Sequence, residues 1–245
     1  MDPWEHETLL WEDDFEGKEV NPHHWCFDTG TNSGWGNQEL QDYRRENATL
    51  ELVEGATCLV LTARRDDKGW TSARLKSKGL QAFQGGKIEA RLKLPQGQGM
   101  WPAFWMLGQD IDRNGWPACG EIDIMEMVGG TKDQGDSVVY ETLHWGSPRE
   151  HLLTDPNNFY RLPQGKFCED FHTFGIDWKP QRIDWYVDGV LRGSHSLQHR
   201  SMGKSFHQPF FLVLNLAVGG IWPGYPDEST TSLQTLTIDW VRVYR

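Results

Sequence analysis

The octapeptide Gly120-Glu121-Ile122-Asp123-Ile124-Met125-Glu126-Met127 has the composition of a β-strand that carries three carboxylates. Side chains alternate between the two faces of a strand, so Glu121 and Asp123 share one face and the isoleucines take the other. Strict alternation would turn Glu126 toward the apolar face. One extra residue, a β-bulge, would return Glu126 to the acidic face, and we expect Met125 to be that residue. The stretch therefore predicts a bulged strand with its three carboxylates on one side.

Two neighbouring carboxyl groups are what a glycosidase needs around a glycosidic bond. With one residue lost to the bulge, the Cα atoms of Glu121 and Glu126 would lie roughly 13 Å apart along the strand. Side chains that lean toward each other would close most of that gap. Retention of the anomeric configuration needs a carboxyl separation of about 5–5.5 Å, and inversion needs about 6.5–9.5 Å. The spacing in the sequence leaves both mechanisms open.

The alternative interpretation of this stretch is a solvated edge strand with its acidic side chains outward. A surface strand has no need to break its alternation, however, and three adjacent carboxylates repel one another. That repulsion is relieved when one carboxyl is protonated, which is the state that an acid catalyst requires. We therefore favour a catalytic strand.

The hexapeptide from Glu121 to Glu126 closely resembles the catalytic signature of glycoside hydrolase family 16, in the form typical of bacterial laminarinases, which are endo-β-1,3-glucanases. Lichenases of that family usually carry a form that is shorter by one residue. The resemblance implies an all-β fold, a β-jelly-roll sandwich of two curved antiparallel sheets (concanavalin A-like) with a cleft on the concave face. It also implies a retaining mechanism with Glu121 as nucleophile, Glu126 as general acid/base and Asp123 as a hydrogen-bonding neighbour of the nucleophile.

Length and composition agree with this assignment. The 245 residues suit a single catalytic domain that spans residues 1–245. The net charge of −11, without a basic run, argues against nucleic acid or an anionic membrane surface as a partner. The 13 tryptophans supply flat faces for stacking or large core fillers. No signal peptide is visible, and we expect an extracellular protein whose signal peptide has been removed.

Metal binding has little support in the sequence. The four widely spaced cysteines contain no Cys-x-x-Cys motif for zinc, and they either form up to two disulfides or remain free thiols. No Asp-x-Asp-x-Asp-Gly loop marks a calcium site. The resemblance implies no cofactor for catalysis. Many family members bind one structural Ca²⁺ on the convex face, largely through backbone carbonyls, and by position Glu16, Gly55 and Asp239 would contribute to it here.

The rest of the chain also predicts strands and turns. Residues 86–94 are apolar at even and charged at odd positions, which places one face in the core and the other in water. Residues 236–244 alternate as well, whereas residues 210–217 are nearly continuously apolar and predict a buried strand. Asp188-Gly189 between two valines indicates a type I′ hairpin. Residues 146–170 are polar and rich in turn formers, and they predict a long loop.

Aromatic and polar residues outside the acidic strand are candidates for sugar binding. In residues 99–107, alternation puts Trp101 and Trp105 on one face and other large apolar residues on the second face, and the two faces cannot both belong to one core. A lone amide in the apolar run 210–217 needs a partner, which a cleft would provide. These segments resemble family segments that line the cleft. The resulting substrate-binding candidates are Trp101, Trp105, His144, Asn37, Arg74, Trp222 and Asn215. Core packing, a surface charge and a structural histidine are the alternatives for the tryptophans, the arginine and the histidine.

The sequence thus predicts a retaining endo-β-1,3-glucanase that acts, as a monomer, on β-1,3-glucan oligo- or polysaccharide. A neutral glucan fits the acidic surface of the chain. Within enzymes, the alternatives are a mixed-linkage β-1,3-1,4-glucanase or another family 16 polysaccharide hydrolase such as an agarase or carrageenase. Outside enzymes, the alternative is a β-glucan-binding protein, although such relatives usually lack the catalytic carboxylates that this chain retains.

Overall fold

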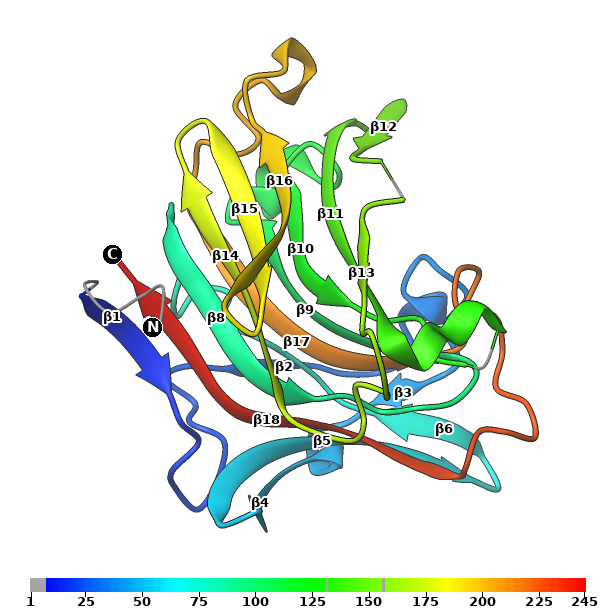
Figure 1. The fold of residues 1–245 in the computed structure, drawn as a ribbon. Helices are drawn as coiled ribbons and strands as arrows, with labels where there is room; N and C mark the ends of the chain where they lie inside the picture. The colour runs from blue at the N-terminus through cyan, green and yellow to red at the C-terminus, as the bar shows by residue number, and fades with distance from the viewer. Residues whose placement is uncertain (1–7, 131, 156) are drawn as a thin grey trace.

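Two β-sheets face each other across an apolar core (Figure 1). The computed structural model describes residues 8–130, 132–155 and 157–245. Within these residues, strand pairing is antiparallel except between the short strands β3 (Asp42–Tyr43) and β6 (Gly69–Ser72). The arrangement is the two-sheet, all-β sandwich that the sequence predicts.

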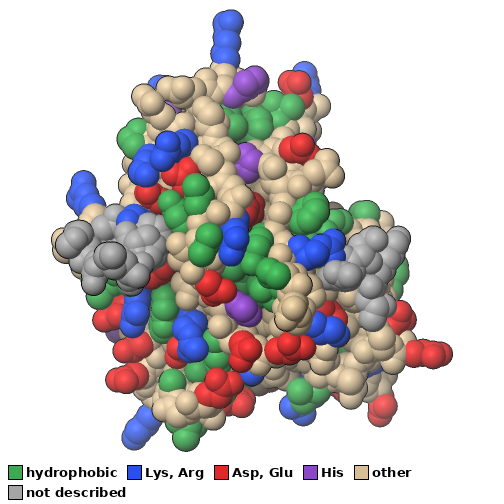
Figure 2. Space-filling view, viewed as in Figure 1, with side chains coloured by type: hydrophobic (Ala, Val, Ile, Leu, Met, Phe, Trp, Pro, Cys, Tyr) green, Lys and Arg blue, Asp and Glu red, His purple; other side chains and the backbone are tan. Residues whose placement is uncertain are grey.

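The first sheet has ten strands and carries both ends of the described chain. Its strands, in spatial order, are β16 (Val190–Ser196), β15 (Arg182–Val187), β14 (His172–Lys179), β8 (Gly86–Lys93), β18 (Leu233–Tyr244), β5 (Ala56–Asp66), β6 (Gly69–Ser72) and β3 (Asp42–Tyr43), with β1 (Leu9–Asp13) beside β18 and β4 (Ala48–Val53) beside β5. Acidic side chains gather around β4, β5 and β18, with lysines and arginines among them (Figure 2). Acidic and basic side chains are therefore interspersed on this sheet.

The second sheet has eight strands and carries the acidic strand near its middle. Its strands are, in order, β12 (Glu150–Leu153), β11 (Val138–Ser147), β10 (Glu121–Glu126), β9 (Met100–Gly108), β17 (Phe210–Val218), β7 (Arg74–Lys76) and β2 (Cys26–Asp28), with β13 (Phe159–Arg161) beside β11. The helical segments are short: α1 (Ile111–Asn114), η1 (Asn32–Gly34), η2 (Arg45–Asn47), η3 (Lys132–Ser137) and η4 (Arg200–Met202). Among the described residues, none of these helices is long and apolar enough to cross a membrane.

The core forms where the apolar faces of the two sheets meet. Ile88, Ala90 and Leu92 of β8 are fully buried, as the alternation predicts, but Glu89 on the opposite face is also buried rather than in water. Every residue of β17 is buried. Trp185 of β15 donates its Nε1–H to the main-chain oxygen of Asp123 at 2.8 Å. This hydrogen bond joins the first sheet to the acidic strand at the point where the regular ladder of that strand is interrupted.

The bulge in β10 is present and includes the predicted residue Met125 together with Ile124, because neither residue has a partner on β11 between Asp123 and Glu126. The pairing with β9 places Asp123 opposite Trp105 and Met125 opposite Phe104, so Ile124, not Met125, lacks a partner there. The three carboxylates pair with Leu107, Trp105 and Ala103, which share one face of β9. Ile124 and Met125 both remain buried in the core, since a bulge lets two consecutive side chains leave the regular alternation. The sequence pattern therefore predicted the extra residue between Asp123 and Glu126, and the structure places the bulge at Ile124 and Met125.

A second bulge corrects the prediction for the last strand. The pairing of β18 with β8 skips Asp239, because Ile238 lies opposite Leu92 and Trp240 opposite Arg91. Ile238, Val241 and Val243 are therefore all buried, although simple alternation would separate them. The strand turns its apolar residues inward by inserting one polar residue.

Two further expectations have clear outcomes. The segment 146–170 is not a continuous loop, because β12 and β13 form within it and pair with β11. Backbone pairing with β11 outweighs the polar composition of the segment. The hairpin prediction is confirmed, since Val187 pairs with Val190 and both Asp188 and Gly189 have positive φ. The structure also decides the cysteine question, because all four thiols are free.

Candidate active site

Three carboxyl side chains lie together on the face of β10 that points away from the core. Glu121 Oε2 accepts a hydrogen bond from Trp116 Nε1 at 2.9 Å, and Glu126 Oε1 accepts one from Trp101 Nε1 at 3.0 Å. Asp123 lies between them in the strand and is only 2% exposed. Each outer carboxyl is thus held by an indole N–H, while the carboxyl between them is enclosed.

Burial raises the pKa of all three carboxyls. Burial, followed by the charge of Asp123, raises the pKa of Glu126 to about 8, while His144 and the Trp101 hydrogen bond oppose the rise. The same two leading causes raise the pKa of Glu121 to about 8. Burial raises the pKa of Asp123 well above its usual range. The three groups therefore cannot all be ionised at neutral pH, and the cluster keeps a proton for acid catalysis.

His144 of β11 joins the acidic cluster to a second histidine. Its Nε2 lies 3.2 Å from Asp123 Oδ2 and 3.7 Å from Glu121 Oε1. Its Nδ1 lies 2.8 Å from Nε2 of His151 on β12. Burial and the charge of His144 lower the pKa of His151, so His151 is neutral at neutral pH. A neutral partner on Nδ1 fixes the ring orientation of His144 and keeps its Nε2 directed at the carboxyls.

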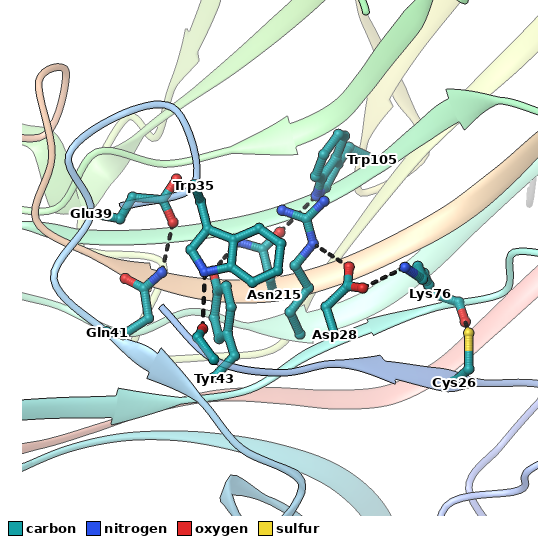
Figure 3. A network of polar contacts seen from close by, with 11 residues as sticks. Cys26, Asp28, Trp35, Glu39, Gln41, Tyr43, Lys76, Trp105 and Asn215 are labelled. Atoms are coloured by element: carbon teal, nitrogen blue, oxygen red, sulfur yellow. Dashed lines mark hydrogen bonds and ion pairs between the residues drawn. The ribbon is translucent and has the colours of Figure 1, made fainter. Parts of the chain in front are cut away.

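A polar network occupies the same face of the sheet on the side of β17 and β7 (Figure 3). Arg74 Nε lies 3.1 Å from Asp28 Oδ2, and the guanidinium lies 4.9 Å from the ring centre of Trp35 and 4.8 Å from that of Trp105. Asn215 Oδ1 accepts a hydrogen bond from Trp105 Nε1 at 2.7 Å. The network thus brings three of the predicted substrate-binding residues into contact.

The loop that contains Asn37 extends this network. Asn37 Nδ2 donates to Glu39 Oε1 at 3.0 Å, and Gln41 Nε2 donates to Glu39 Oε2 at 2.6 Å (Figure 3 shows Glu39 and Gln41). Burial raises the pKa of Glu39, while these two hydrogen bonds and the charge of Arg74 oppose the rise. The main-chain oxygen of Asn37 accepts from Ile221 N at 2.8 Å. The loop is therefore fixed both to the network and to the segment that carries Trp222.

Comparison with known proteins identifies the family of this site. Residues 27–242 match the family described as glycosyl hydrolases family 16. The chain belongs to this family. The catalytic domain of an endo-1,3-beta-glucanase (laminarinase) from Thermotoga petrophila RKU-1 is 43% identical, with a TM-score of 0.86 and 98% of each chain covered.

Two curated relatives of this family 16 chain are similar over nearly their whole length. A "Beta-glucanase" from Rhodothermus marinus is 37% identical over 98% of this chain and 86% of its own. A "Glucan endo-1,3-beta-glucosidase" from Cryptopygus antarcticus is 37% identical over 96% of this chain and 91% of its own. Family 16 enzymes are glycoside hydrolases that act with retention and need no cofactor for catalysis.

Trp222 lies at the Glu126 end of the family 16 site. It is 45% exposed and contacts the edge of Trp101, with ring centres 5.5 Å apart and an interplanar angle of 87°. Its ring also lies 5.0 Å from that of Tyr140 on β11. Trp222 therefore connects the loop after β17 with the strand on the opposite side of β10.

The predicted calcium residues lie elsewhere, near the first sheet. Asp239 accepts a hydrogen bond from Arg91 Nη1 at 2.5 Å, so a guanidinium already neutralises the carboxylate that would face the ion. Glu16 follows β1, and Gly55 lies in the turn between β4 and β5. The Arg91 contact makes the Asp239 carboxylate a poor calcium ligand but does not involve its main-chain oxygen, and the calcium set stays a prediction. Among the described residues, the side chains grouped closely enough to hold an ion are Glu121, Asp123 and His144.

Sequence reasoning missed several residues that contact the predicted ones. Trp116 was part of a loop, and His151 was part of the segment 146–170 that predicted no strand. Both lie beside the acidic cluster, where their rings are 4.6 Å apart. Tyr140 could have been found, because it lies at even spacing from the candidate His144 and, in a strand, such residues share one face. The remaining missed contacts are Trp35, Glu39 and Tyr43.

Proposed function

We propose that this family 16 chain is a retaining endo-β-1,3-glucanase. The observation that carries the proposal is the bulge at Ile124 and Met125, which places Glu121, Asp123 and Glu126 on one face of β10. The names of the relatives support β-1,3-glucan as the substrate. The family match over residues 27–242 supports one catalytic domain in this chain. We further infer that the enzyme acts outside the cell as a monomer on a neutral glucan.

In the first step, Glu126 acts as the acid and Glu121 as the nucleophile. Glu126 transfers its proton to the glycosidic oxygen as the bond from that oxygen to the anomeric carbon breaks. The ionised Glu121 forms a bond to the same carbon, which gives a covalent glycosyl-enzyme. Trp116 and His144 stabilise the charge on Glu121 before attack, and the buried Asp123 disfavours a third charge.

In the second step, Glu126 acts as the base. It takes a proton from a water molecule whose oxygen attacks the anomeric carbon, and the bond from that carbon to Glu121 breaks. Glu126 is then protonated and Glu121 ionised, as at the start. The two inversions give net retention, so one pair of carboxyls performs both steps.

The polar network would bind the part of the glucan that stays on the enzyme. Arg74, Asn37 and Asn215 supply donors and acceptors for sugar hydroxyls, while Trp105 supplies an aromatic face. Trp101 and Trp222 would stack on glucosyl rings near Glu126. A pre-formed network costs less to order when substrate binds, which favours productive positioning.

Substitution of Glu121 by Ala tests the proposal. We expect reducing-end release from laminarin to fall to background, while the protein stays folded and still binds laminarin. Azide should restore turnover of an activated aryl β-glycoside and give an α-glycosyl azide, because the small anion fills the space of the lost carboxylate. Glu51→Gln, at an exposed glutamate of β4, is the matched control and should keep full activity. Turnover of laminarin by Glu121→Ala would refute the proposal.

Product analysis separates the alternatives. We expect short β-1,3-linked products from laminarin, fewer products from mixed-linkage lichenan and none from agarose. Preferred cleavage of lichenan would make the chain a β-1,3-1,4-glucanase. Binding of laminarin without release of reducing ends by the unmodified protein would make it a β-glucan-binding protein.

A further inference from the structure

One row of paired residues crosses the second sheet through Glu126. On one side, the row passes through β9 to Asn215 of β17 and Arg74 of β7. On the other side, it passes through Tyr140 of β11 to Phe159 of β13. Directly paired residues of antiparallel strands point to the same face. The whole row therefore lies on the face that carries the three carboxyls.

The two halves of this row differ in chemistry. The half with Arg74 is a network of charged and amide groups. The half beyond Glu126 is aromatic: the ring of Tyr140 lies 5.0 Å from Trp222 and 6.1 Å from Phe159. The first half can bind sugar hydroxyls in a fixed orientation, whereas the second offers ring faces that hold a sugar without fixing its hydroxyls.

Phe159 is exposed at the surface and is not part of the core. Its side chain is 46% exposed, although it belongs to a strand that pairs with the edge of an apolar sandwich. Arg161 lies two residues away on the same strand, with its guanidinium 5.9 Å from the Phe159 ring. A large exposed ring that continues a line of aromatic contacts from the site is a common sign of ligand contact.

We propose that Tyr140 and Phe159 form a binding site for the leaving glucosyl units of the substrate. This inference rests on the proposed function, because the acid Glu126 must touch the oxygen of the leaving unit. Neighbouring strands lie about 4.8 Å apart, so the backbone of Phe159 lies about 10 Å from that of Glu126, beyond the first leaving ring. The part of the glucan that forms the covalent intermediate then lies over the polar half, and the departing chain lies along the aromatic half.

A pair of substrates with the same retained part tests this proposal. A laminari-oligosaccharide places sugars on the leaving side, whereas a nitrophenyl β-laminaribioside places only the aryl group there. For Phe159→Ala, kcat/KM on the oligosaccharide should fall roughly three- to tenfold, as loss of one aromatic contact predicts. The value for the aryl glycoside should not change. Phe159→Trp should keep the activity on both, because it retains a ring face.

Leu52→Ala is the matched control, because Leu52 is an exposed apolar residue of the first sheet, away from the site. Its kcat/KM should equal that of the unmodified enzyme on both substrates. If Phe159→Ala lowered kcat/KM equally on both substrates, or lowered it on neither, the proposal would be overturned. The glucanase assignment would stay intact. An unmodified protein that cleaves neither substrate would instead overturn the proposed function, and this proposal with it.

Discussion

The acidic cluster and the polar network lie on the same face of one sheet and both bury carboxyl groups, yet they compensate these groups to different degrees. In the network, Asp28 contacts both Arg74 and Lys76, and Glu39 accepts hydrogen bonds from two amides. In the cluster, the charges that shift the pKa of Glu126 are those of Asp123 and His144. Compensated carboxylates hold other side chains in place, whereas undercompensated ones retain a proton. This difference separates binding from chemistry within a single cleft.

Removal of the general acid Glu126 should give the largest fall in activity. For Glu126→Gln, we expect kcat/KM on laminarin to fall roughly 10²–10⁴-fold, because the leaving oxygen loses its proton donor. An aryl glycoside with a good leaving group needs less protonation. The rate of the first step on that substrate should therefore fall far less. Burst kinetics on both substrates would measure this. Equal losses on the two substrates would contradict the acid role of Glu126.

Breaking the network should reduce the rate without changing its pH dependence. For Arg74→Ala, we expect kcat/KM to fall roughly tenfold and the free energy of unfolding to fall by about 1–3 kcal/mol, because Asp28 loses one partner. The midpoints of the pH–rate profile should stay where they are in the unmodified enzyme. A shifted profile would show that the network and the cluster act as one electrostatic unit.

The stability that depends on the acidic cluster should change with pH. The folded-state pKa of Glu126 is raised to about 8, so the folded protein binds the extra proton and its stability falls as pH rises from about 4.5 through 8. Glu126→Gln removes this loss, so the variant should be more stable than the parent at pH 8 and similar to it at pH 5. Asp28→Asn should destabilise at neutral pH, because it removes the partner of Arg74 and Lys76. Thermal melts at both pH values would measure the difference.

Substitution of His151 should lower the rate by a smaller factor. For His151→Ala, Nδ1 of His144 loses its partner, and we expect kcat to fall about five-fold, in line with the loss of one hydrogen bond. The pH–rate profile should shift because a reoriented His144 no longer keeps its contacts with Asp123 and Glu121. His151→Gln keeps a polar partner and should recover part of the rate. An unchanged profile in both variants would remove His151 from the site.

Chelation should have the smallest effect. Arg91 already binds the carboxylate of Asp239, so EDTA should leave kcat on laminarin unchanged. A calcium-dependent rise in Tm that is lost in Asp239→Asn would instead support the predicted ion at Glu16, Gly55 and Asp239.

The sequence predicted the architecture and the catalytic strand because both depend on local patterns. Alternation placed the strands, Asp188-Gly189 marked its hairpin, and the phase break between Asp123 and Glu126 required one extra residue. Alternation could not separate Ile124 from Met125 as the extra residue, since both are apolar and both fit the core; the pairing with β11 skips both residues and the pairing with β9 skips only Ile124. The polar composition of residues 146–170 predicted a loop, which was wrong. Pairing with β11 creates two strands there that a polar sequence does not indicate.

By itself, the sequence determined that three carboxyls share one face of a bulged strand in an all-β family 16 protein. Only the tertiary structure decided which groups surround them, because most of those groups come from other strands. The Trp101 donor, the His144–His151 pair and the row from Arg74 to Phe159 arise from strand order and register, whereas the Trp116 donor comes from the loop just before β10. Burial by these neighbours raises the carboxyl pKa values, and burial is a property of the packed chain rather than of any local segment.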